Sequence, residues 1–209
     1  MKRIGKSVAF WGILLLCCEV YKQIVLFRAY GYYVWWYFPW QLCSLPMYLA
    51  SALLFVKDDN AKDTVFAFLS SFSLLGGIAV FFDPSGLHYF RTDLTVLSYL
   101  WHISMILFGL LSYSCVRNKN TGFRNACILY LCCCTMALLL NLLLNSRGEI
   151  NLFYINPLQK MPQIIFRDLV PLLGNNTVIV LYILLTILGA YLLYRMNGWL
   201  ENKIHDHKI

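Results

Sequence analysis

The sequence predicts an all-α membrane protein, a bundle of six transmembrane helices of which the second is kinked. Of its 209 residues, 60% are hydrophobic and only 13% are charged, whereas a soluble domain carries about a quarter charged residues. The apolar residues gather in windows close to the ~20 residues that a spanning helix requires. Short clusters of Lys and Arg stand at the ends of these windows. We therefore expect one six-span domain over residues 1–209.

The first expected span covers residues 8–27. Its clean apolar run stops at Glu19, so the helix must continue through Glu19 and Lys22 to reach a spanning length. These two residues are three positions apart and can pair on one face of the helix. They form either an interfacial ion pair or a carboxylate that faces the bundle interior, as intramembrane ionisable residues usually do. No A-x-A-like site follows the run, so no cleavable signal peptide is expected.

The second expected span covers residues 36–56 and begins in an aromatic belt of tyrosine and tryptophan, which is typical of a membrane interface. Within it, Pro46 removes a backbone donor and predicts a kink. The proline would release the carbonyl of Leu42, which lies one residue from the Cys43 thiol. A kink, a free carbonyl and a thiol at one place indicate a site.

The remaining expected spans cover residues 64–82, 94–116, 126–144 and 178–196. Gly76 and Gly77 permit a close helix approach in the third span. The long connection 145–176 contains an amphipathic piece at 164–173, and connections of this length are usually functional or interfacial. With the N-terminus inside, eleven of the 17 Lys and Arg residues fall on the cytoplasmic side and six outside. This bias predicts that both termini are cytoplasmic.

Charge and cysteine content exclude several classes of protein. The net charge is +7, but the basic residues stand in clusters at segment ends, which indicates topology rather than nucleic-acid binding. The eight cysteines show no C-x-x-C and no zinc-type spacing, so we expect no metal, no cofactor and no disulfide. Cys17, Cys18 and Cys132 to Cys134 lie in mid-segment, where cysteine packs as a small apolar residue.

Four polar or reactive side chains from four spans are expected in one layer of the outer leaflet. At 1.5 Å per residue, Cys43 lies roughly 10 Å from the outer end of its span, and His102 and Glu19 lie roughly 12 Å from theirs. Asn141 stands near the outer end of the fifth span. Tyr99 precedes His102 by three residues and shares its helix face.

A Cys–His pair in such a layer has a definite chemical use. The thiolate is a nucleophile, and a neighbouring imidazole lowers its pKa or accepts its proton. Asn141, Asn145 or Asn151 would supply amide donors for an oxyanion. The alternative is a histidine bonded to a neighbouring helix and a packed cysteine, because polar contacts between membrane helices are common.

Three motifs resemble those of the YwaF-like integral membrane family, which includes transmembrane protein 164-like proteins. The stretch Pro-Trp-Gln-Leu-Cys-Ser-Leu-Pro at 39–46 resembles its proline-x-x-Leu-Cys signature. Trp101-His102, followed by Gly109, resembles its histidine-containing helix, and Asn-Leu-Phe-Tyr at 151–154 resembles its N-Y-x-Y-L motif.

The resemblance implies a six-helix membrane fold and, as in the animal member, cysteine-dependent acyl transfer onto lysophospholipid. By position it implies Cys43 as the nucleophile, His102 as the base and Asn151 as a structural or oxyanion-side partner. Gln41 stands where some family members carry histidine.

The expected function is therefore that of a membrane-embedded lipid acyltransferase or lipid-ester hydrolase, with phospholipid or lysophospholipid as its partner. The alternative is a non-enzymatic substrate-capture subunit of a vitamin importer. In that case four side chains would line the pocket: Trp35, Trp36, Trp40 and Gln41. Ligand co-purification discriminates the two, and oligomeric state, acyl donor and acceptor stay open.

Overall fold

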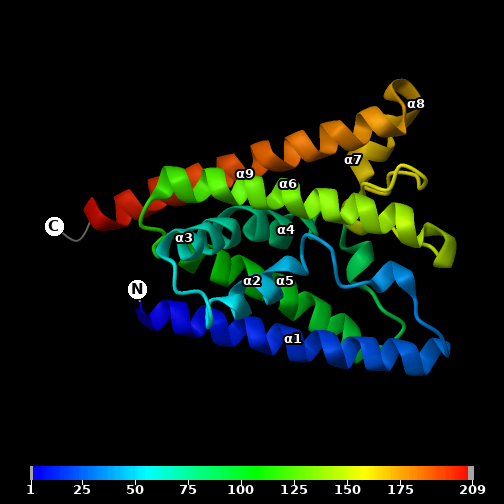
Figure 1. The fold of residues 1–209 in the computed structure, drawn as a ribbon, viewed down its shortest axis with the longest axis horizontal. Coiled ribbons are helices and arrows are strands. Elements are labelled where there is room, and N and C mark those ends of the chain that lie inside the picture. The colour runs from blue at the N-terminus through cyan, green and yellow to red at the C-terminus, as the bar shows by residue number, and fades with distance from the viewer. Residues whose placement is uncertain (1, 207–209) are drawn as a thin grey trace.

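The computed structural model describes the backbone of residues 2–206 and the side chains of residues 4–203. Helices and their connections make up this part of the chain, which contains no strand. The N-terminal end of α1 and the C-terminal end of α9 lie at the same end of the molecule (Figure 1). The four long helices are α1 (Lys2–Tyr30), α5 (Thr92–Tyr113), α6 (Lys119–Leu144) and α9 (Asn175–Asp206).

Four segments are long and apolar enough to cross a membrane: Ile4–Tyr30, Thr92–Tyr113, Lys119–Arg147 and Asn175–Lys203. They contain or largely overlap the first, fourth, fifth and sixth expected spans. The all-α class and the membrane assignment are therefore confirmed, whereas the count of six helices is not.

The second expected span, 36–56, is not a continuous helix. The chain forms η1 (Trp35–Tyr37), an irregular stretch, and then α2 (Leu45–Ala52). Pro46 lies in the first turn of α2, where the missing N–H has no intrahelical partner to lose. The proline therefore begins a helix here instead of kinking one, and the expected kinked second helix is not confirmed.

The third expected span, 64–82, corresponds to three consecutive pieces. These are α3 (Asp59–Phe68), the π-helical η2 (Leu69–Ser73) and α4 (Leu74–Ala79). Asn197 of α9 donates a hydrogen bond from its side-chain nitrogen to the carbonyl of Ser70 at 3.0 Å. Because a π-turn leaves backbone groups out of the regular ladder, this amide satisfies one of the groups that the insertion displaces.

The long connection between α6 and α9 is ordered and partly buried. It contains four short helical turns, and residues 150–153 and 155–156 are almost inaccessible. The amphipathic piece expected at 164–173 forms two single turns. The turns are η4 (Asn145–Arg147), η5 (Leu152–Tyr154), α7 (Ile164–Arg167) and α8 (Val170–Leu173). A further short turn, η3 (Pro84–Leu87), precedes α5.

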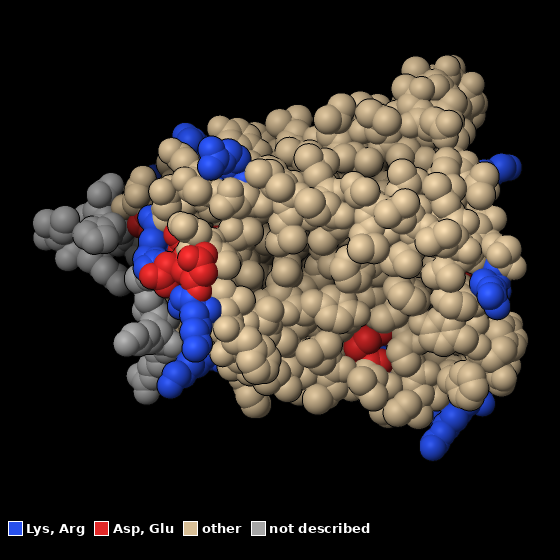
Figure 2. All heavy atoms as spheres, viewed as in Figure 1, with Lys and Arg blue, Asp and Glu red and all other residues tan. Residues whose placement is uncertain are grey.

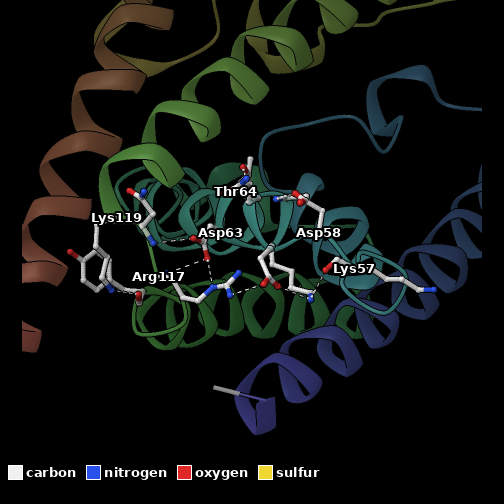
Figure 3. A network of polar contacts seen from close by, with 12 residues as sticks. Lys57, Asp58, Asp63, Thr64, Arg117 and Lys119 are labelled. Carbon is white, nitrogen blue, oxygen red and sulfur yellow. Dashed lines mark hydrogen bonds and ion pairs between the residues drawn. The ribbon is translucent and has the colours of Figure 1, made fainter.

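Charged side chains gather at the two ends of the molecule, and the middle of the visible face is almost free of them (Figure 2). At the end that carries the start of α3, Asp63 is buried and accepts the backbone N–H groups of Arg117 and Asn118 at 3.1 and 3.0 Å (Figure 3). The Arg117 guanidinium pairs with Asp59 at 2.7 Å. This network fastens the α5–α6 turn to α3.

Candidate functional site

Cys43 lies two residues before α2, on the irregular stretch that replaces the expected helix. The indole nitrogen of Trp101 on α5 donates a hydrogen bond to its backbone carbonyl at 2.9 Å. The hydroxyl of Ser104 donates to the Trp101 carbonyl at 2.7 Å, and the Trp11 indole of α1 donates to that hydroxyl at 2.9 Å. These hydrogen bonds hold the Cys43 backbone against α5, and α5 against α1.

His102 follows Trp101 and is 8% exposed. Its Nδ1 lies 2.8 Å from the carbonyl oxygen of Ser98. A carbonyl only accepts, so Nδ1 carries a proton and the neutral ring has its free electron pair on Nε2. Among the described residues, Nε2 has no hydrogen-bond partner. The backbone therefore holds the imidazole in the tautomer that a general base requires.

Glu19 is 5% exposed and fully partnered. It accepts Lys22 at 2.7 Å and the side-chain nitrogen of Gln23 at 2.7 Å. The same Gln23 nitrogen donates to the Tyr37 carbonyl at 2.7 Å. Glu19 thus lies in the interior as half of an ion pair, and this cluster fastens α1 to η1.

Gln41 binds the long connection at two points. Its side-chain nitrogen donates to the Asn151 carbonyl at 3.1 Å, and its side-chain oxygen accepts the Phe153 N–H at 2.7 Å. Gln41 lies two residues before Cys43. This carboxamide therefore holds the 151–153 backbone beside the stretch that carries the thiol.

Asn141 of α6 binds the same segment from another side. It is completely buried, donates to the Leu152 carbonyl at 3.0 Å and accepts the Leu152 N–H at 2.7 Å. Both the oxygen and the nitrogen of its amide are thus engaged by the Leu152 backbone, so Asn141 fixes this segment against α6.

Asn151 is 2% exposed, and its side-chain oxygen accepts the Asn156 N–H at 3.0 Å. This bond fixes the orientation of the amide. Among the described residues, the NH₂ group has no hydrogen-bond partner. Compared with Asn141, whose NH₂ group already donates to a carbonyl, Asn151 keeps its NH₂ group available.

Tyr99 lies apart from this cluster of contacts. Its ring contacts His88 and Phe81, with centroids 6.0 and 6.2 Å away. The residue therefore packs toward the connection between α4 and α5, and its contacts point to a packing role.

Two of the three tryptophans proposed to line a binding pocket, Trp35 and Trp40, are used in packing. Trp40 donates from its indole to the Cys133 carbonyl at 3.4 Å, and Trp35 stacks on Phe38 with centroids 6.2 Å apart. A groove of about 670 Å³ lies elsewhere, between α1 and α5, and is almost wholly apolar. Its lining residues are Cys17, Cys18, Tyr21, Thr92, Asp93, Val96, Leu97 and Leu100.

A sequence-family model of the TMEM164 family matches residues 1–196. The chain belongs to this family. The match confirms the transmembrane protein 164-like part of the resemblance, while acyl transfer remains a proposal. No curated protein and no solved structure matches the chain.

For this TMEM164-family chain, sequence reasoning missed how the carboxamides are used. Asn156 donates to the Ile150 carbonyl at 2.7 Å and to the Asn145 side chain at 3.1 Å. Asn175 accepts the Met161 N–H at 3.2 Å. A signal was available, because asparagine recurs along the connection 145–176. Such residues commonly satisfy buried irregular backbone.

Proposed function

We propose that this TMEM164-family protein is a membrane-embedded lipid acyltransferase or lipid-ester hydrolase that acts through a Cys43 thioester. The observation that carries the proposal is the junction of Cys43 with the Trp101–His102 pair. Trp101 binds the Cys43 carbonyl at 2.9 Å, and the next residue is a buried imidazole whose Nε2 is free among the described residues.

The chemistry follows from the roles of the two side chains. His102 Nε2 takes the Cys43 proton, and the thiolate attacks the carbonyl carbon of a lipid ester. A C–S bond forms while the carbonyl electron pair moves to oxygen. The pair then returns, the C–O bond breaks, and the departing alkoxide takes the proton back from His102. In the second half of the reaction, a lysophospholipid hydroxyl, or water, gives its proton to His102 and attacks the thioester carbonyl. The C–S bond then breaks, and the Cys43 sulfur takes the proton back from His102.

The Asn151 NH₂ group supports an oxyanion-side role for this residue, because its amide is oriented by Asn156 and retains unpaired donors. Gln41, Asn141 and Glu19 support the site indirectly. Their hydrogen bonds hold the backbone around it and leave no role as nucleophile or base.

The groove between α1 and α5 suits the acyl chain of a lipid that approaches from the bilayer. Cys18 in its wall is followed by Glu19, and Leu100 is followed by Trp101.

We further propose that the chain crosses the membrane six times. The irregular stretch with α2, and the α3–α4 piece, would form the second and third crossings, with both termini cytoplasmic. A cysteine introduced at the exposed Asn176 would then react with an impermeant maleimide from outside, whereas labelling from the cytoplasmic side alone would reverse this orientation.

The deciding experiment follows acylation of the purified full-length chain in phospholipid vesicles by intact-protein mass spectrometry. Cys43 should acquire an acyl group that hydroxylamine removes, and Cys43→Ser should remain folded and nearly inactive. His102→Ala should slow acylation by about 10²–10⁴-fold, as the loss of a general base does.

A matched control is Cys133→Ser, which changes a buried thiol on α6 and should leave acylation unchanged. Full lipid turnover by Cys43→Ala would show that Cys43 is not the nucleophile and would leave it a packing role.

A further inference from the structure

Two consecutive residues in the buried connection adopt a left-handed backbone. Phe153 has a φ of 55° and Tyr154 a φ of 58°. Bulky residues rarely occupy this region because their Cβ approaches the neighbouring carbonyl. Such strain persists only where the surroundings hold it, and it is concentrated at functional sites.

Carboxamide side chains hold this turn in place. The Phe153 N–H is bound by Gln41 at 2.7 Å, and both backbone groups of Leu152 are bound by Asn141 at 2.7 and 3.0 Å. Asn156 binds the Ile150 carbonyl at 2.7 Å. Gln41 and Asn141, from two elements that precede the connection, therefore fix this strained turn together with Asn156 of the connection itself. A segment that only links two helices would not require a strained turn.

The turn that contains Tyr154 is bound to the stretch that contains Cys43. Gln41, which binds the backbone on both sides of Leu152, is two residues from Cys43, so the turn lies beside the stretch that carries the thiol. Burial raises the pKa of Tyr154, and a negative charge on Cys43 raises that pKa further. The phenol is therefore within electrostatic reach of the thiolate. Among the described residues, its hydroxyl has no hydrogen-bond partner.

We propose that Tyr154 is a catalytic residue, whose hydroxyl donates a hydrogen bond to the acyl carbonyl oxygen when Cys43 attacks. The proposal rests on the acyl transfer proposed above. As the C–S bond forms, the carbonyl electron pair becomes an oxyanion, and the Tyr154 hydroxyl binds this oxygen without giving up its proton. When the C–O bond breaks, the pair returns to the carbonyl and the hydrogen bond weakens.

The burial that surrounds Tyr154 suits this role. A donor must be protonated at neutral pH, and the raised pKa of the phenol keeps it so. A pre-positioned donor also requires no reorganisation during the reaction, and the carboxamide-held turn supplies that rigidity.

The test is Tyr154→Phe, which removes one hydroxyl and keeps the ring. In vesicles of phosphatidylcholine and phosphatidylethanolamine, its rate of Cys43 acylation should fall by about 10²–10³-fold, the effect of losing one oxyanion donor. The KM and the unfolding temperature should stay near those of the parent, since this hydroxyl binds no described residue. Tyr89→Phe is the matched control. Tyr89 is also partly buried, and Cys43 raises its pKa too, so its variant should retain the parent rate.

A second comparison tests the positioning role of Gln41. Gln41→Leu alone should slow acylation, because the turn is released, but should add little when Tyr154 is already phenylalanine. A parent rate for Tyr154→Phe, with Cys43→Ala inactive, would overturn the role of Tyr154 and leave the nucleophile in place. Full turnover by Cys43→Ala would overturn both.

Discussion

The Trp101 indole nitrogen donates a hydrogen bond to the Cys43 carbonyl at 2.9 Å, across 58 positions of sequence. The residue that holds the cysteine backbone is thus the immediate neighbour of the candidate base, His102. Any displacement of Trp101 relative to Cys43 therefore changes the position of the His102 imidazole relative to the Cys43 thiol. The same link makes the stretch before α2 part of the packed bundle.

Trp101→Phe should therefore lower both stability and acylation. The loss of one net hydrogen bond costs about 1 kcal/mol in unfolding free energy, and the Cys43 backbone loses its support. Thermal unfolding and the vesicle assay measure the two effects. Trp199→Phe, at a tryptophan that is 55% exposed, is the control and should change neither. Parent-like behaviour of Trp101→Phe in both assays would contradict this reading.

Asn141→Leu should be among the most destabilising single changes in α6. It removes the partner of the N–H of a completely buried residue, Leu152, and one of the two donors to its carbonyl, which keeps the Ile155 N–H at 3.2 Å. An unpaired buried N–H of this kind costs about 1–3 kcal/mol. Chemical unfolding of purified protein measures the loss. Asn120→Leu changes an exposed asparagine at the start of the same helix and should be nearly neutral, so equal losses for the two variants would refute the argument.

Gly12→Ala should disrupt the contact of α1 with α2. A Cβ at Gly12 would lie 2.5 Å from the Ser51 backbone nitrogen and 2.7 Å from the Ala50 Cβ, so the helices must separate. Overpacking of this kind costs about 1–3 kcal/mol or more, visible as a lower unfolding temperature. Gly86→Ala is the control, because a Cβ there meets nothing within 4 Å. The prediction fails if both variants unfold at the parent temperature.

Asp59 should titrate below its ordinary range in the folded protein. Hydrogen bonds from Arg117, and then from Lys62, lower the pKa of its carboxyl. A pKa that is lower when folded stabilises the protein above the unfolded value, about 3.9, and this stability is lost as the pH falls through the folded value. Arg117→Gln should raise the Asp59 pKa toward its ordinary value, as carboxyl NMR can measure.

Asp83 provides the control for this titration. Hydrogen bonds from Ser85 lower the pKa of its carboxyl, so its pKa should not move in Arg117→Gln. An unchanged Asp59 in that variant would show that Arg117 is not the cause.

The sequence by itself determined the class of protein and most of its long helices. Apolar windows near the spanning length predicted the helices around 8–27, 94–116, 126–144 and 178–196, because burial in a bilayer imposes both length and composition. It also singled out Cys43, His102 and Asn151 by residue type and motif. These features depend on local chemistry, which can be read along the chain.

Only the tertiary structure decided what surrounds these residues. Proline chemistry alone did not distinguish a kink at Pro46 from the start of α2, since that choice depends on partners for the freed backbone. Asn141 was expected to serve an oxyanion, yet its amide binds Leu152, eleven positions away. The strained turn at Tyr154 exists because carboxamides from Gln41 and Asn141 bind it. Hydrogen bonds between distant segments leave no periodic signal in a sequence. The sequence therefore showed which carboxamide side chains are present, and only the packing determined which backbone groups they bind.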